Sequence, residues 1–166
     1  KTFAADLIHY RPTLVATVPR LWEALYGKVV NAVAEQGRSA LGIFKLLVRV
    51  SARFRRARRR LAGHWPQFRK APWPVRIWWK LAAACELAVL ALPSAAAQKK
   101  LAPLRQKFGG RLRMAVSGGG SLPAYLEVWL DAIGLRIANA YGMTECAPAI
   151  AGRGFNSEML GTLGPP

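Results

Sequence analysis

One stretch in the C-terminal third of the chain limits the fold more than any other. The run RLRMAVS (111–117) is typical of a strand, and the glycine-rich SGGGS follows it. PAYLEVWLDAIG (123–134) then has the apolar spacing of a helix that starts on proline and ends on glycine, and the strand-like LRIANA comes next. Strand, glycine loop, helix and strand in this order predict an α/β fold, in which flanking helices cover parallel strands.

Both predicted strands end in a loop that suits a ligand. In parallel α/β sheets, ligands bind beyond the carboxyl ends of the strands, where SGGGS and YGMTE (141–145) fall. Glycines let a backbone approach a ligand closely, and a helix start adds N–H donors. YGMTE offers a ring that can stack on a purine, a hydroxyl for phosphate and a carboxylate for Mg²⁺. The alternatives are an ordinary turn and a helix cap after a core tyrosine, but together the loops indicate a nucleotide pocket.

The first 107 residues are predicted to be mainly helical. TLVATV (13–18) has the composition of a short strand, and Pro19 suits the first turn of a helix. Apolar spacing predicts four helices: one from Pro19 to about Gly37, one from about Ser39 to Leu61, VRIWWKLAAACELAVLAL stopping at Pro93, and a shorter one from Ala95 to Lys107.

The net charge of +17 is concentrated in one segment. Residues 38–80 contain thirteen Lys/Arg and no Asp or Glu, so the remaining twelve basic and eight acidic residues give the rest of the chain +4. Arginines interleaved with tryptophans in 52–80 suit an anionic membrane surface, where each cation contributes about 1 kcal/mol. A solvated face ranks second, and nucleic acid ranks third because no recognition motif accompanies the charge. The twelve residues LAAACELAVLAL are too few to span a bilayer.

The two cysteines, Cys85 and Cys146, have no His or Cys at ligand spacing, so neither a disulfide framework nor a zinc site is expected. The opening residues KTFAADLIHYRP lack the apolar run of a signal peptide. We therefore expect a cytoplasmic protein, peripheral at the inner face of the cell membrane if the basic segment binds lipid. The missing initial Met and the Gly/Pro-rich end suggest a piece of a longer protein.

Four stretches stand in a characteristic order: VPRLWEALYGKV (18–29), GGRLRMAVSGGGSLP (109–123), IANAYGMTECAP (137–148) and GTLGPP (161–166). In this order the chain resembles the acyl-adenylate-forming (AMP-binding) enzymes, most closely the long-chain fatty-acid–CoA ligases (acyl-CoA synthetases). The resemblance implies part of the family's large N-terminal domain. It divides the chain into adenylation-domain segments at 1–37 and 101–166, the second with the nucleotide loops, and a basic helical insertion at 38–100.

The resemblance also implies roles for the loop residues. Nucleotide binding is expected at Gly118, Gly119, Gly120, Asn139, Ala140, Tyr141, Gly142 and Thr144. Tyr141 would stack on the adenine, which Asn139 would also contact. Thr144 would contact phosphate and Glu145 would hold Mg²⁺, which makes these two the predicted catalytic residues. Trp22, in VPRLWE, is expected to be a core residue rather than a ligand contact.

The implied reaction is the ATP-dependent activation of a fatty acid as acyl-AMP, followed by transfer of the acyl group to coenzyme A. Its catalysis depends on positioning and charge neutralisation rather than on a protein nucleophile. The family's phosphate loop, its downstream aspartate and arginine, and its small domain with a lysine are not in this sequence. The chain alone is therefore expected to be inactive. The competing interpretation is a truncated, non-catalytic module that binds a membrane or nucleic acid.

Overall fold

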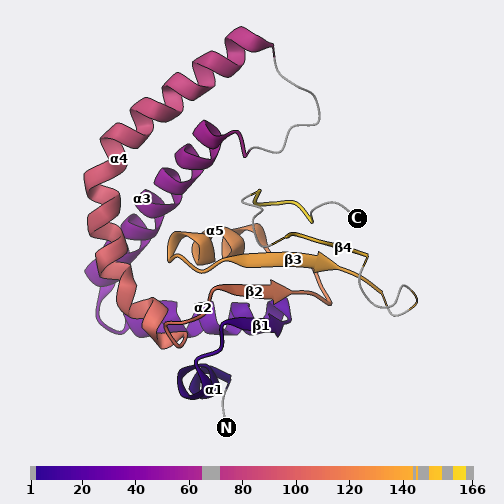
Figure 1. Ribbon diagram of the computed structural model, residues 1–166. Coiled ribbons are helices and arrows are strands. Elements are labelled where there is room, and N and C mark those ends of the chain that lie inside the picture. Colours follow the sequence, from indigo (N-terminus) through magenta and orange to yellow (C-terminus); the bar gives the residue numbers. More distant parts are fainter. Residues whose placement is uncertain (1–2, 65–71, 144, 146–149, 155–158, 164–166) are drawn as a thin grey trace.

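A computed structural model describes residues 3–64, 72–143, 145, 150–154 and 159–163 (Figure 1). This part of the chain contains five helices and four strands, which follow one another in the order α1 (Phe3–Tyr10), β1 (Leu14–Thr17), α2 (Pro19–Ala34), α3 (Arg38–Ala62), α4 (Trp73–Lys107), β2 (Met114–Ser117), α5 (Ala124–Ala132), β3 (Ile137–Tyr141) and β4 (Ala151–Gly152).

The strands form one sheet in the order β1-β2-β3-β4. The first three are parallel, with Thr17 opposite Ser117 and Ser117 opposite Asn139. This confirms the parallel α/β arrangement expected from the sequence. The short β4 pairs with β3 in the antiparallel direction and was not predicted, because two residues give no periodic signal.

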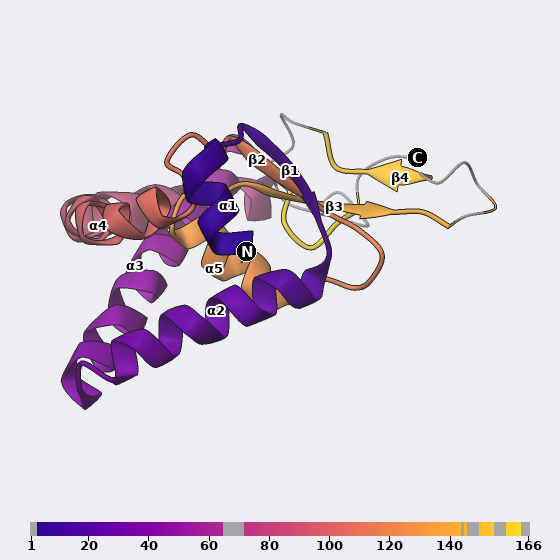
Figure 2. The same cartoon turned by 90° about the horizontal axis from the view of Figure 1, so that it is seen from below.

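The core lies where α2 and α5 pack on one side of the sheet (Figure 2). The ring of Tyr26 from α2 meets that of Trp129 from α5 edge-on, with centroids 5.1 Å apart. Trp22 is completely buried, and its Nε1 donates a hydrogen bond to Thr17 Oγ1 at 2.7 Å. The expectation that Trp22 is a core residue is therefore confirmed.

Helix α4 differs from the prediction. It runs from Trp73 to Lys107 as one helix with Pro93 and Pro103 inside it, so the expected stop at Pro93 is wrong. A proline removes the hydrogen bond to the carbonyl four residues earlier, here that of Val89, and Val89 is 75% exposed, so water can reach this carbonyl. Burial of Ala97 and Leu101 beyond the proline favours continuation.

The longer helix also changes the estimate of its apolar length. By length and composition alone, α4 is the single helix in the described part of the chain that could cross a membrane, and 17% of its apolar window is buried. The same test is passed by some helices of proteins outside membranes. The apolar part of this helix is therefore longer than the twelve residues that the sequence indicated.

Helices α3 and α4 run side by side away from the sheet (Figure 1). The N-terminal half of α3 is nevertheless anchored in the core, because Phe44 belongs to the buried cluster. Ser51 Oγ also donates a hydrogen bond to the carbonyl of Ala132, at the end of α5, at 2.7 Å. Residues 38–100 thus contribute to the core at one end, and their status as an insertion stays a prediction.

The connection from α4 to β2 depends on one glycine. Gly109 has a φ of +85°, and a Cβ there would lie 2.4 Å from the carbonyl oxygen of Leu7 in α1. Both the backbone conformation and the space exclude a side chain. The neighbouring Gly110 has a φ of +71° but has nothing within 4 Å of a Cβ.

Candidate functional site

The carboxyl ends of β1, β2 and β3 meet at one edge of the sheet. Their last polar side chains, Thr17, Ser117 and Asn139, occupy neighbouring positions in the register. Neighbouring positions in a pleated sheet direct their side chains to the same face. The edge therefore brings together the two loops selected from the sequence, as expected.

The glycine loop lies in the fork between the exits of β1 and β3. The Gly118 N–H continues the sheet by donating to the carbonyl of Thr17 at 3.1 Å. A Cβ on Gly118 would lie 3.6 Å from the Ala140 carbonyl oxygen, and one on Gly120 would lie 3.6 Å from the ring of Pro19. Contacts on both sides fix the position of the loop relative to the exit of β3.

Two buried polar atoms at this edge have no hydrogen-bond partner among the described residues. They are Ser117 Oγ and Asn139 Oδ1, on adjacent strands in direct register. An unsatisfied buried polar group costs about 1–3 kcal/mol, so such a pair calls for a ligand or an ordered water. Asn139 was selected from the sequence. Ser117 was missed, since only the strand register places it beside Asn139.

The described residues of YGMTE, at the exit of β3, are exposed to solvent. Tyr141 is the last residue of the strand and is 48% exposed, so it is not the core tyrosine of the alternative interpretation. Gly142 and Glu145 are also exposed, and Ala140 is half-buried opposite Gly152 of β4. The predicted phosphate contact Thr144 lies outside the described residues.

The carboxylate of Glu145 has no metal-ligand cluster around it. Among the described residues, no group of three or more His, Cys, Asp or Glu side chains could hold a metal ion. Mg²⁺ is commonly bound by one or two carboxylates together with substrate phosphates and water. The exposed carboxylate of Glu145, which follows the exit of β3, is compatible with that mode of binding.

A buried ion pair fastens the last described segment to the domain. Arg153 is 4% exposed, and its guanidinium pairs with Glu127 of α5 while also donating to the carbonyls of Ile137 and Met159. The other Glu127 oxygen accepts a hydrogen bond from Gly161 N at 2.9 Å. Sequence reasoning missed this pair, because nothing local in the sequence shows that these residues, 26 positions apart, meet.

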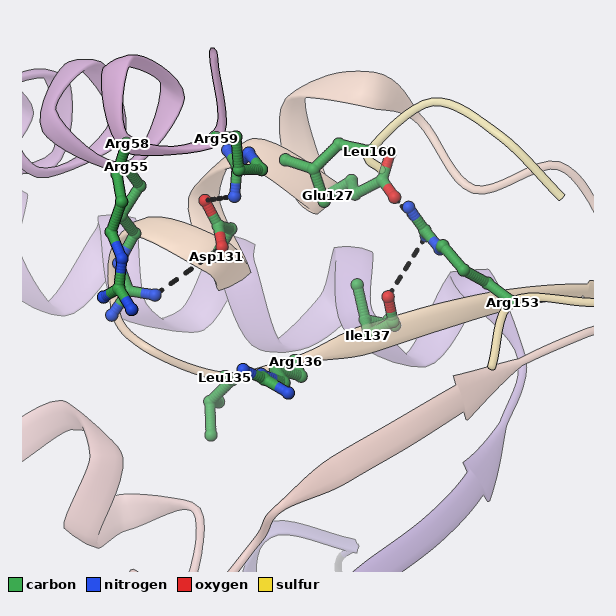
Figure 3. A pocket seen from close by; sticks show the side chains of 10 residues that line it. All are labelled: Arg55, Arg58, Arg59, Glu127, Asp131, Leu135, Arg136, Ile137, Arg153 and Leu160. Carbon is green, nitrogen blue, oxygen red and sulfur yellow. Dashed lines mark hydrogen bonds and ion pairs between the residues drawn. The ribbon is translucent and has the colours of Figure 1, made fainter. Parts of the chain in front are cut away.

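A second polar region lies at the amino end of β3. Here a cavity of about 100 Å³ is lined by five arginines, two carboxylates and three apolar residues (Figure 3): Arg55, Arg58, Arg59, Glu127, Asp131, Leu135, Arg136, Ile137, Arg153 and Leu160. From α3, Arg59 Nη1 is 2.8 Å from Asp131 Oδ2, and Arg55 Nη1 is 3.7 Å from Asp131 Oδ1. Two arginines of the basic segment, Arg55 and Arg59, are therefore in contact with the α/β core through Asp131 of α5.

Burial affects the pKa of Arg55. Desolvation lowers the pKa of its guanidinium below the ordinary value, and Arg59, Arg105 and Arg58 lower it further, whereas Asp131 raises it. An arginine remains protonated at neutral pH even so. The cavity thus contains a partly desolvated cation surrounded by other cations.

The chain was compared with known proteins. The family model described as "AMP-binding enzyme" matches residues 1–166. Curated relatives include the chloroplastic long-chain-fatty-acid–acyl-carrier-protein ligase AEE15 of Arabidopsis thaliana, 28% identical over 97% of this chain and 22% of the relative. The long-chain-fatty-acid–CoA ligase FadD15 of Mycobacterium bovis is 28% identical over 100% of this chain and 24% of the relative.

A third relative, the putative fatty-acid–CoA ligase fadD11 of Mycobacterium tuberculosis, is 31% identical over 99% of this chain and 25% of its own length. The chain therefore spans about a quarter of the curated relatives that it matches. No solved structure matches.

Proposed function

Since the chain belongs to the AMP-binding enzyme family, we propose that the protein that carries it is an ATP-dependent long-chain fatty-acid ligase. It activates the fatty acid as acyl-AMP and transfers the acyl group to coenzyme A. The names of the relatives support a fatty acid as substrate, and two of the three name CoA as acceptor. The third names acyl-carrier protein, so the acceptor is part of the test below.

One observation supports the proposed nucleotide site above all others. Ser117 Oγ and Asn139 Oδ1 are buried beneath the glycine loop with no hydrogen-bond partner among the described residues, and the half-exposed Tyr141 lies two residues beyond Asn139. An adenine base has a flat face for the ring and polar edges for hydroxyl and amide groups. In the proposal, the base stacks on Tyr141 and its edge satisfies Asn139.

The remaining loop residues position the phosphates. Gly118, Gly119 and Gly120 leave the backbone open to the ligand, and α5 starts four residues after Gly120. Thr144 is proposed to contact phosphate. Glu145 is proposed to hold Mg²⁺, which would neutralise phosphate charge when it is bound.

The chain alone is proposed to be inactive, because the family's phosphate loop and lysine domain lie outside it. The experiment is ATP–pyrophosphate exchange with a panel of fatty acids, on the protein that carries the chain. Glu145→Ala should reduce exchange at least about a hundredfold, as expected for loss of a transition-state charge contact. Glu35→Ala, which removes an exposed carboxylate at the far end of α2, is the matched control. Transfer to CoA and to acyl-carrier protein is then measured separately.

Exchange that depends on a fatty acid and is lost in Glu145→Ala alone supports the proposal. Equal activity of the two variants would show that Glu145 takes no part. Exchange by the isolated chain would contradict the proposed need for the missing parts.

A membrane surface is a second proposed partner, favoured by α4. Five exposed residues recur on one face of this helix at spacings of three or four: Trp78, Leu81, Cys85, Val89 and Leu92. Such a stripe is typical of an apolar face that another phase or protein covers. Together with the arginines of α3, it suits the interface of an anionic bilayer. The protein would then be cytoplasmic and peripheral at the inner face of the membrane.

Cosedimentation with anionic and neutral vesicles tests this partner. Leu92→Ser should weaken binding to anionic vesicles, whereas Leu46→Ser, at an exposed leucine of α3 outside the stripe, should not. Tight binding to competing duplex DNA without binding to vesicles would assign the basic segment to nucleic acid instead. Binding to neither would leave it as a solvated face.

A further inference from the structure

The cavity at the amino end of β3 carries more positive charge than its carboxylates neutralise. Besides Arg136, four arginines and two carboxylates line it, which leaves an excess of +2 among these six residues (Figure 3). Glu127 is already engaged by Arg153. Asp131 therefore faces Arg55 and Arg59 as the one remaining carboxylate of the lining.

Arg55 is the most constrained of these cations. Its Nε is buried and has no hydrogen-bond partner among the described residues, and its ion pair with Asp131 is long, at 3.7 Å. Arg105 adds a further positive charge, because both guanidinium groups lie within 3.4 Å of the Cβ position of Gly134. Like charges held this close repel one another unless an anion lies between them.

We propose that this cavity binds a phosphate group. The planar fork of arginine matches phosphate oxygens, and a doubly charged phosphate neutralises the excess that one carboxylate leaves. A volume of about 100 Å³ accommodates a group of this size. Soluble phosphomonoesters and lipid headgroups both carry such a group, and the site would recognise the same oxygens in either.

The phosphate site is distinct from the proposed nucleotide edge. Ile137 lines the cavity and Tyr141 lies at the opposite end of the same strand, about 13 Å away at the usual rise per residue. Its lining comes from α3, α5, the start of β3 and the segment after β4, and none from the glycine loop. The inference therefore does not depend on the proposed ligase activity.

Calorimetric titration with inorganic phosphate tests the site in the protein that carries the chain. Arg58 and Arg56 are both exposed on α3, but only Arg58 lines the cavity. Arg58→Gln should weaken phosphate binding about tenfold, as expected for one charge-assisted contact. Arg56→Gln makes the same change of net charge and should stay within about twofold, because salt screens charges beyond about 8 Å.

A third variant tests the competition between ligand and protein. Asp131→Asn removes the negative charge that repels phosphate and competes with it for Arg55 and Arg59, so it should tighten phosphate binding several-fold. Circular dichroism shows whether Asp131→Asn is folded. If it is not folded, the comparison of Arg58→Gln with Arg56→Gln still tests the phosphate site. Weaker binding in folded Asp131→Asn, or equal effects of the Arg58 and Arg56 variants, would overturn the proposal.

Vesicles distinguish the two sources of the phosphate group. Vesicles of phosphatidylcholine with and without phosphatidic acid are compared for wild type and both arginine variants. Binding to phosphatidic acid that Arg58→Gln weakens and Arg56→Gln does not assigns the site to a headgroup. If Arg58→Gln selectively weakens binding of inorganic phosphate but not binding to phosphatidic acid vesicles, the site is assigned to a soluble ligand. Absence of saturable binding to either probe rejects the site.

Discussion

The buried ion pair between Glu127 and Arg153 provides a quantitative test of the fold. Glu127→Gln keeps the size of the side chain but leaves the Arg153 guanidinium, 2% exposed, without its counter-charge. Breaking one partner of a buried pair costs about 3–5 kcal/mol. Two carbonyls, of Ile137 and Met159, still accept hydrogen bonds from Arg153, which places the expected loss near the lower end, about 3 kcal/mol.

The assay is urea unfolding of the protein that carries the chain, followed by tryptophan fluorescence. Glu86→Gln is the control, because its ion pair with Arg53 is exposed and should contribute less than about 1 kcal/mol. Arg153→Met alone and combined with Glu127→Gln completes a double-mutant cycle, with an expected coupling of at least about 2 kcal/mol. A loss in Glu127→Gln no larger than in Glu86→Gln, or strictly additive effects, would refute the reasoning.

Two further predictions concern the backbone and the proposed adenine contact. Gly109→Ala should destabilise the fold by at least about 2 kcal/mol, because its Cβ would collide with the Leu7 carbonyl oxygen. Gly110→Ala should destabilise it by only about 1 kcal/mol, through left-handed backbone strain, and comparison of the two urea midpoints checks the difference. Tyr141→Ala should weaken ATP binding by about 1–3 kcal/mol, whereas Tyr141→Phe should not weaken it, because stacking needs only the ring. Calorimetry measures ATP binding by both variants, and equal losses of affinity would contradict stacking.

The sequence was informative where a pattern extends over many residues. The strands at 13–18, 111–117 and 135–140 were placed correctly to within three residues at each end, and their parallel order follows from the intervening helices. The glycine loop and Tyr141 were expected at one edge of the sheet because parallel strands end together. The approach of Gly118 to Ala140, the residue before Tyr141, agrees with that expectation, because a Cβ on Gly118 would lie 3.6 Å from the Ala140 carbonyl oxygen.

The sequence was less informative where the answer depends on tertiary structure. Pro93 is a helix breaker by local chemistry, yet packing of the residues beyond it against α3 keeps α4 continuous. The arginines of α3 formed a uniform charged run in the sequence. In the structure, Arg55 and Arg59 pair with Asp131, whereas Arg56 and Arg58 are exposed. This difference depends on which face of α3 is covered by α5.

The central claim is that the carboxyl edge of β2 and β3 binds the adenosine nucleotide. Hydrogen–deuterium exchange with and without ATP and a fatty acid tests it most directly, because the exchange is resolved along the chain. The account predicts that the ligands protect the backbone amides of residues 117–120 and 139–142 from exchange. Exchange should change little in a control segment, residues 28–34 at the C-terminal end of α2. Protection confined to other segments, with unchanged exchange at both loops, would contradict it.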